Sequence, residues 1–144
     1  MAVDFYNAGM NAFQGGRHKE AYEWLIQGAD DPRCYYALGV LYYNGQGVER
    51  SFKKSTEYYA RAAEAGIVPA QVSAGFAYAN AMGVPEDFDK AAHYLKMAVA
   101  AGEPAAKVTL AEIYAKGHGG GSRKEAAALI REVLATGNSE EAMD

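Results

Sequence analysis

The stretch ALGVLYYNGQGVERSFKKSTEYYARAAEAG, residues 37–66, decides the fold because the chain repeats it. A shift of 36 positions sets it on AGFAYANAMGVPEDFDKAAHYLKMAVAAG, residues 74–102, and the alignment needs no gap. Self-similarity at a fixed period of this length is typical of proteins built from stacked structural repeats. The positions that coincide include Gly39 with Gly75, Tyr42 with Tyr78, Phe52 with Phe88, Lys54 with Lys90, Tyr58 with Tyr94 and Gly66 with Gly102.

Two further copies complete the chain. LAEIYAKGHGGGSRKEAAALIREVLATG, residues 110–137, is a third copy with one residue deleted from its loop. NAGMNAFQGGRHKEAYEWLIQGA, residues 7–29, is a divergent copy in which Gly9 aligns with Gly39 at a shorter spacing of 30. The sequence therefore consists of four versions of one unit.

Each copy is predicted to form two helices. Capping residues and prolines mark the starts of helices, and glycines, which adopt left-handed backbone angles readily, mark their ends. The start signals are Asp31-Pro32, Ser51, Pro69, Asp87, Pro104 and Ser122, the last with Glu125 as a capping box. The end signals are Gly45, Gly66, Gly102, Gly117 and Gly137. The predicted helices span residues 3–14, 18–29, 32–44, 51–65, 69–81, 87–101, 104–116 and 122–136.

The predicted fold class is all-α. A helix pair cannot bury its apolar face alone, so pairs of this kind stack on one another. We expect an α-solenoid of about four helix-turn-helix repeats, eight helices in all, wound as a right-handed superhelix. Residues 1–137 form its single domain, and residues 138–144 form a flexible acidic tail. The predicted repeats span residues 3–29, 32–65, 69–101 and 104–136.

Charge and hydropathy restrict the partners. The formal net charge of −4 and the pI near 5.4 argue against nucleic acid or an anionic membrane surface. No apolar run approaches the roughly 20 residues of a membrane-spanning helix, so membrane insertion is not expected. The N-terminal segment has Asp4 where a secretory leader would be basic, which favours a cytoplasmic location, with delivery into a host or another compartment left open. Cys34 is the lone cysteine, which rules out an intrachain disulfide.

Residues 37–66 resemble the SEL-like repeat (SLR), a longer relative of the tetratricopeptide repeat. The family pattern has small residues and Leu-Gly before an aromatic residue, a Gly-x-Gly-Val loop, and a second helix rich in Lys, aromatic residues and Ala. Residues 74–102 match it strongly, residues 110–137 match it moderately, and the first copy is closer to a tetratricopeptide repeat. One departure is Ala81, which stands where a glycine opens the loop elsewhere. The resemblance implies a scaffold that holds peptides or partner proteins, often in bacterial signalling, envelope or host-interaction contexts.

A Ser-x-x-Lys element, Ser51-Phe52-Lys53-Lys54, is the sharpest enzymatic candidate. A few SLR relatives have been linked to β-lactam binding, so a serine hydrolase of that type is a remote alternative. The chain offers no Ser-Asp-Asn or Lys-Thr-Gly partner motif, and Asp87 stands at the position of Ser51 in the next copy. A catalytic serine would not be interchangeable with an aspartate, so we expect Ser51 to cap a helix and the protein not to be an enzyme.

Cofactor and metal sites are not expected. GQG and GHGGG lack the preceding strand and the Gly-Lys-Ser/Thr ending of a phosphate-binding loop. The three histidines, His18, His93 and His118, lie in three different copies without a cysteine or carboxylate at ligand spacing. His93 is expected to face solvent beside Tyr94. Cys34 is expected to be a small buried residue of the repeat.

The first helix of each copy carries the functional signal. Helical periodicity assigns Leu38, Leu41, Tyr42, Ala74, Ala77 and Tyr78 to the core. The other face is apolar, rich in tyrosine, and has two asparagines in register. The candidate protein-binding residues on that face are Tyr6, Met10, Phe13, Arg33, Tyr36, Val40, Tyr43, Asn44, Val72, Phe76, Asn80 and Glu112.

By resemblance to related solenoids, these residues should line a concave groove. Tyrosine supplies contact area at low entropic cost, and an asparagine amide can clamp an extended backbone. The leading hypothesis is a non-enzymatic adaptor that binds another protein or a peptide, for instance as a bacterial inhibitor, immunity protein or chaperone. The alternatives are a homo-oligomeric scaffold, and a short superhelix that closes over the strip.

Overall fold

The computed structural model describes residues 2–28 and 30–143 of the 144-residue chain. This part of the chain holds eight helices and no strand, as predicted. The helices are α1 (Phe5–Gln14), α2 (His18–Gln27), α3 (Pro32–Asn44), α4 (Phe52–Glu64), α5 (Val68–Ala79), α6 (Phe88–Ala100), α7 (Pro104–Ala115) and α8 (Arg123–Met143).

The predicted helix starts are confirmed by hydrogen bonds from the cap residues. Ser51 Oγ accepts from the backbone N–H of Lys54 at 3.2 Å, and the Asp87 carboxylate caps α6 at 3.0 Å in the same way. Ser122 Oγ accepts from the N–H of Glu125 at 3.1 Å and donates to the Glu125 carboxylate at 3.3 Å. Each bond satisfies a backbone donor that has no partner within the helix.

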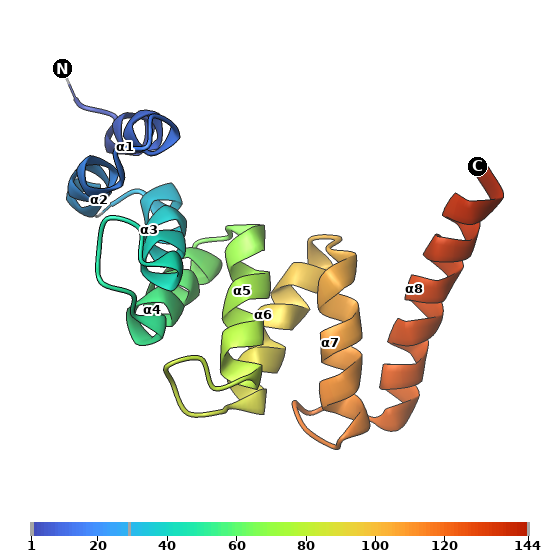
Figure 1. Ribbon diagram of the computed structural model, residues 1–144. Coiled ribbons are helices and arrows are strands. Elements are labelled where there is room, and N and C mark those ends of the chain that lie inside the picture. The colour runs from blue at the N-terminus through green and yellow to red at the C-terminus, as the bar shows by residue number, and fades with distance from the viewer. Residues whose placement is uncertain (1, 29, 144) are drawn as a thin grey trace.

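Successive helix pairs form a curved row, with α1 and α2 at one end and α8 at the other (Figure 1). The second helix of each repeat packs against the first helix of the next, as α4 does against α5 and α6 against α7. First helices also contact one another, α1 with α3 and α5 with α7. The first helices therefore lie on the inner side of the curve, and the chain is a helical solenoid of helix-turn-helix repeats.

Close helix packing explains the glycines inside the first helices. A Cβ at Gly39 would lie 2.6 Å from the Tyr59 ring, and one at Gly75 would lie 2.5 Å from Leu95. The two helices of a repeat are thus as near as their backbones allow. Most of the predicted core positions are buried, with Tyr78 half-buried.

The loop inside each repeat docks on the preceding repeat. Gly83 lies against the backbone of Phe52 and Lys53 at the start of α4, where a Cβ would overlap. Thr56 Oγ1 donates to the carbonyl of Met82 in the same loop at 2.8 Å. The glycines of these loops are therefore packing residues, because they let one repeat rest on the next.

Three helix ends differ from the prediction by two residues or more. Helix α2 ends at Gln27, whereas the predicted end at residue 29 lies outside the described residues. Helix α5 ends at Ala79, and Ala81 takes a left-handed φ of 54°. Helix α8 runs to Met143, so the end predicted at residue 136 is wrong. A glycine inside a helix costs only about 1 kcal/mol, and Glu140, Glu141 and Ala142 beyond Gly137 favour a helix. That residues 138–144 act as a flexible acidic tail stays a prediction.

Candidate protein-binding groove

The candidate residues of the first two repeats gather in a pocket between α1 and α3. This proximal pocket has a volume of about 130 Å³. Its walls are almost wholly apolar. The lining residues are Tyr6, Met10, Phe13, Leu25, Tyr36, Ala37, Val40 and Leu41.

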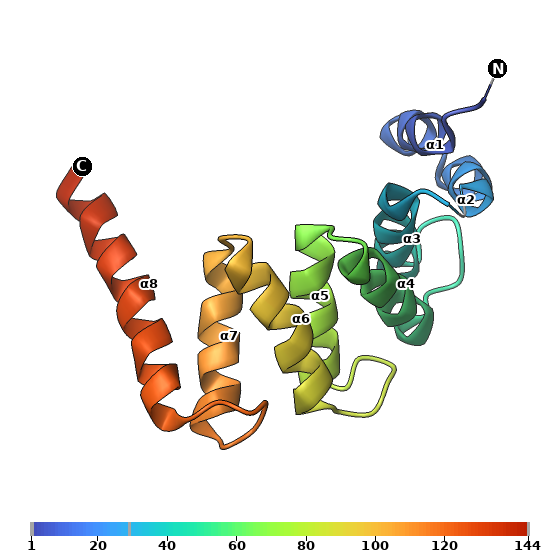
Figure 2. The ribbon, with the colours of Figure 1, turned by 180° about the vertical axis from the view of Figure 1, so that it is seen from behind.

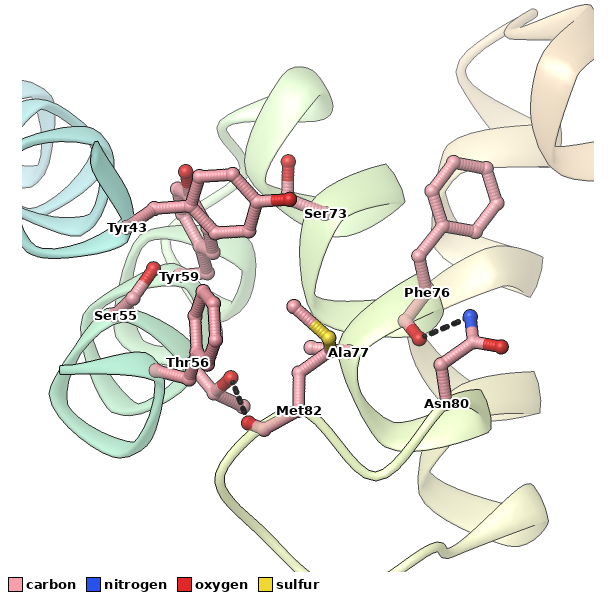
Figure 3. Close-up of a pocket in the computed structure, with 10 residues that line it drawn as sticks. Tyr43, Ser55, Thr56, Tyr59, Ser73, Phe76, Ala77, Asn80 and Met82 are labelled. Carbon is pink, nitrogen blue, oxygen red and sulfur yellow. Dashed lines mark hydrogen bonds between the residues drawn. The ribbon is translucent and has the colours of Figure 1, made fainter. Parts of the chain in front are cut away.

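A second, larger pocket lies between α3, α4 and α5 (Figure 3). This central pocket has a volume of about 380 Å³, within the range of sites that hold small ligands or single side chains. Its walls are apolar, with hydroxyl groups from tyrosine, serine and threonine. The lining residues are Tyr43, Phe52, Ser55, Thr56, Tyr59, Ser73, Phe76, Ala77, Asn80 and Met82.

Tyr43 forms the exposed edge of the central pocket. Its side chain is 41% exposed, and its ring centroid lies 5.4 Å from that of Phe52. Tyr59 lies deeper, and burial raises the pKa of its phenol to about 12. The phenol stays neutral and can donate a hydrogen bond at physiological pH.

Polar groups of the wall are partly committed to the fold. Ser55 Oγ donates to the carbonyl of Gly39 at 2.7 Å, and the Thr56 hydroxyl is used by the loop at Met82. Ser73 projects into the pocket opposite Tyr43 in Figure 3. The hydroxyls of Tyr43 and Ser73 are therefore the groups best placed to meet a ligand.

The candidate residues of the third and fourth repeats lie only partly in these pockets. Val72 and Phe76 pack against the core formed by α6, α7 and α8, and Figure 3 shows the Phe76 ring directed away from Tyr43. Glu112 is exposed beside a shallow depression of about 370 Å³ between α7 and α8. The structure thus brings Tyr6, Met10, Phe13, Tyr36 and Val40 together in the proximal pocket and Tyr43, Phe76 and Asn80 in the central pocket. It leaves Arg33, Asn44, Val72 and Glu112 outside both.

Arg33 is held in place at the start of α3. Its guanidinium pairs with Asp31 at 2.7 Å and lies 3.6 Å from Asp4, and it covers the Tyr6 ring at 4.4 Å. The hydrogen bond from Arg33 lowers the pKa of Asp31, which caps α3. Arg33 therefore touches the proximal pocket only through the Tyr6 ring that it covers, and it lines a separate depression beside Asp4, Asp30 and Asp31.

The two asparagines do not present free amides in register. Asn80 Nδ2 donates to the carbonyl of Phe76 in its own helix at 2.8 Å, and Asn44 Nδ2 donates to Gln46 Oε1 at 3.3 Å. Only Asn80 lines the central pocket. Each amide thus makes a local bond at its own helix end or loop, and that the two asparagines clamp a bound peptide backbone stays a prediction.

Sequence reasoning missed the wall that the second helix supplies. Phe52, Thr56 and Tyr59 of α4 line the central pocket together with Met82 of the next loop. These residues lie at spacings of four and three along α4, which is one face of a helix. That periodicity was present in the sequence and would have identified the wall.

Ser51 and Lys54 serve the fold. Ser51 caps α4. Among the described residues, its hydroxyl contacts the backbone N–H of Lys54, and no side-chain acid or base bonds to it. Lys54 Nζ lies over the Tyr42 ring at 5.4 Å, and its equivalent Lys90 lies over Tyr78 at 5.2 Å. The repeat lysine therefore makes a cation–π contact with the repeat tyrosine.

The histidines and the cysteine lie at separate places. His93 is exposed, bonds Glu64 at 2.9 Å and lies beside Tyr94, as predicted. His118 stacks on Phe88 with ring centroids 4.6 Å apart. Burial raises the pKa of the Cys34 thiol to about 11.

Two kinds of feature are absent from the described residues. They contain no cluster of three or more His, Cys, Asp or Glu side chains suited to a metal ion. They also contain no helix with the length and hydropathy needed to cross a membrane.

Comparison with known proteins gives one family and a consistent fold. The family model described as Sel1 repeat matches residues 6–31, 32–67 and 68–103, which correspond to the first three repeats. A Sel1 repeat protein from Oxalobacter formigenes has a similar crystal structure, with a TM-score of 0.76 and 23% identity. A protective antigen of uropathogenic Escherichia coli strains, which displays an SLR fold, superposes with a TM-score of 0.85 and 25% identity.

The solved structures are longer than this chain. The matches cover 93% of this chain and 55% of the Oxalobacter protein, and 94% of this chain and 31% of the Escherichia coli antigen. No curated protein matches the sequence.

Proposed function

Because the chain belongs to the Sel1 repeat family, we propose that it is a non-enzymatic adaptor that binds an extended segment of another protein along its first helices. Repeats of this family typically mediate protein–protein interactions. The observation that carries the proposal is the pair of apolar pockets on the inner side of the curve, the proximal and the central pocket. A bacterial inhibitor, immunity protein or chaperone is one form that such an adaptor takes.

The spacing of the pockets suggests what the segment looks like. Tyr36 lines the proximal pocket and Tyr43 the central pocket, and both belong to α3. Seven residues of helix span about 10 Å. A peptide in the polyproline II conformation advances about 3.1 Å per residue with three residues per turn, so two anchor side chains about three residues apart would point the same way and reach both pockets.

The chemistry of the walls defines the anchors. The proximal pocket takes a compact aliphatic side chain, since it is small and almost wholly apolar. The central pocket takes a larger or aromatic side chain, since it is wider and carries the Tyr43 and Ser73 hydroxyls.

Tyr43 provides a clean test because the fold does not require it. Alanine stands at the equivalent positions 79 and 115, so Tyr43→Ala restores a residue that the repeat accommodates. A displayed library of random linear peptides is the probe. Selected peptides should carry two large apolar side chains about three residues apart, and Tyr43→Ala should weaken their binding about tenfold or more.

The matched control is Ile26→Ala, which truncates a similarly exposed apolar side chain on α2. It should leave peptide affinity unchanged, and circular dichroism should show equal helicity for both variants. Failure to select any peptide, or peptides that bind Tyr43→Ala and the parent protein equally, would refute the groove. For the hydrolase alternative, the deciding result is turnover of a β-lactam that disappears with Ser51→Ala.

A further inference from the structure

The proximal and central pockets lie at successive joints of the solenoid. The first joint is where α3 follows α1 and α2, and the second is where α5 follows α3 and α4 (Figure 2). The repeat alignment therefore pairs the residues of the two walls, and the packing agrees with it. A Cβ at Gly9 would lie 2.6 Å from the Leu25 side chain. At the equivalent Gly39 it would lie 2.6 Å from the Tyr59 ring. At three paired positions the central pocket has a hydroxyl group and the proximal pocket has none: Tyr43 stands in place of Phe13, Tyr59 in place of Leu25, and Ser73 in place of Ala37.

The fold does not use the hydroxyl of Ser73. Ser73 is half-buried in α5, and its hydroxyl makes no hydrogen bond to another described residue. Helix packing does not require this hydroxyl, because Ala37 fills the same position at the preceding joint. Drawing a hydroxyl out of water without a partner is unfavourable, so an unused hydroxyl in a pocket wall is suited to a ligand.

The occupant of the central pocket is uncharged. None of the ten residues that line it carries a charge at neutral pH, since burial raises the pKa of the Tyr59 phenol to about 12. An ionised side chain would lose its hydration in this pocket and would meet no opposite charge. The anchor must therefore be a neutral side chain.

The space and the rings of the central pocket favour an aromatic anchor. Ala77 stands in place of Leu41 of the proximal wall, and the volume is about 380 Å³ instead of about 130 Å³. The rings of Tyr43, Phe52 and Tyr59 border this space. Aromatic rings attract one another in offset and edge-to-face arrangements, beyond the area that they bury. An aromatic anchor thus gains more from these walls than an aliphatic one.

The hydrogen-bonding capacity of the wall selects among aromatic side chains. The Thr56 hydroxyl donates its hydrogen to the Met82 carbonyl, so it can only accept a further bond. The hydroxyls of Ser73 and Tyr43 are not committed to other described residues, so they can donate as well as accept. A phenol both donates and accepts, whereas an indole N–H only donates and a phenyl ring does neither. A tyrosine side chain therefore matches both kinds of group.

On the basis of the proposed function, we propose that the central pocket binds a tyrosine side chain of the bound segment and that Ser73 is the residue that selects it. The tyrosine ring packs among the aromatic walls, and its phenol exchanges hydrogen bonds with the free hydroxyls. A wall without those bonds would favour phenylalanine, because a buried phenol would lose its bonds to water. The order of affinity for tyrosine and phenylalanine therefore reports on the hydroxyls.

Peptides from the displayed library test this selection. Peptides that bind the parent protein and lose affinity with Tyr43→Ala should carry a tyrosine as one of their anchors. Replacing that tyrosine with phenylalanine should weaken binding to the full chain about tenfold in calorimetric titration, as expected for the loss of one or two neutral hydrogen bonds. Ser73→Ala should weaken binding of the tyrosine peptide and leave that of the phenylalanine peptide unchanged.

Thr109→Ala is the matched control for Ser73→Ala. Thr109 occupies the position of Ser73 in the next first helix and lines neither pocket, so its truncation should leave the tyrosine preference intact. Circular dichroism should show equal helicity for both variants. A merely structural role of Ser73 would weaken both peptides alike.

Two small molecules test the pocket without any peptide. p-Cresol and toluene reproduce the side chains of tyrosine and phenylalanine, and shifts of the backbone amide signals of the isotope-labelled full chain report where each binds. p-Cresol should bind at the central pocket more tightly than toluene, and Ser73→Ala should reverse the order. If no peptide is selected but p-cresol behaves in this way, the adaptor function fails and the preference of the pocket for a phenol stands. Selected peptides that bind equally well with phenylalanine in place of tyrosine, or toluene that binds as tightly as p-cresol, would overturn the tyrosine proposal and leave the groove itself in place.

Discussion

Replacing Ala81 with glycine should stabilise the protein. Ala81 is the one non-glycine residue with positive φ among the described residues, at 54°. Its equivalents in the neighbouring repeats are Gly45, with φ of 67°, and Gly117, with φ of 83°. The loop of the third repeat thus has the geometry of the others, but the residue that forms it carries a Cβ.

The size of the effect follows from two opposing contributions. An L-residue in the left-handed region costs roughly 1–2 kcal/mol, because Cβ crowds the following carbonyl oxygen. Glycine at the same position costs about 0.5–1 kcal/mol, because the unfolded chain gains freedom. Ala81→Gly should therefore increase the free energy of unfolding by about 0.5–1 kcal/mol. For a domain of this length that raises Tm by roughly 2–4 °C.

Urea unfolding followed by far-ultraviolet circular dichroism measures the change, with an unchanged slope as the sign that only stability differs. Gly117→Ala is the reverse experiment at the equivalent position. A Cβ there meets no atom within 4 Å, so backbone strain alone should destabilise the protein by a similar amount. If Ala81→Gly lowers the stability, or if Gly117→Ala has no effect, left-handed strain at this position is not the controlling quantity.

Three other measurements follow from the structure. Ser51→Ala should cost about 1 kcal/mol of stability while Ser51→Asp costs little, because the next repeat caps with Asp87; equal losses in urea unfolding would contradict the cap. Burial raises the pKa of Tyr59 to about 12 from about 10 in the unfolded chain, so stability should be full below pH 10 and fall as the pH rises towards 12. In Tyr59→Phe the slope of unfolding free energy against pH between pH 10 and 12 should be smaller by about one proton. An unchanged slope would argue against a raised pKa of Tyr59. Cys34, fully buried, should react with a thiol reagent at least about a hundredfold more slowly in native protein than in urea, and equal rates would contradict its burial.

The fold was predictable because the same helix signals occur in several copies of the repeat. Glycines and caps recur at a fixed period, and each recurrence supports the same helix boundary. Two of the helix ends that differed lie where that support is weakest. Ala81 replaces the glycine that ends its counterparts, and Gly137 is followed by residues that favour a helix.

The site was predictable only in part. Periodicity separates the faces of one helix, but it does not say which neighbouring helix each face meets. Tyr36 and Val40 line the proximal pocket beside α1 and also pack against the α4–α5 core, whereas Phe76, at the equivalent position to Val40, packs against the α6–α7 core and lines the central pocket. That distinction depends on the curvature of the row and on side-chain direction, which belong to the assembled solenoid.

Departures from the repeat identify surfaces better than apolar faces do. At the position of Tyr43 the third and fourth repeats carry Ala79 and Ala115, and the first carries Phe13. At the position of Ala63 the third repeat carries Val99 and the last carries Leu134. Tyr43 and Leu134 are thus large apolar side chains, 41% and 59% exposed, at positions where at least one other repeat has alanine. Neither side chain gains its full burial from the fold. If packing alone explained these two residues, Tyr43→Ala and Leu134→Ala would each destabilise the isolated monomer by the 2–5 kcal/mol typical of core truncations. We expect losses below about 1 kcal/mol for both, with peptide binding as the property that changes in Tyr43→Ala.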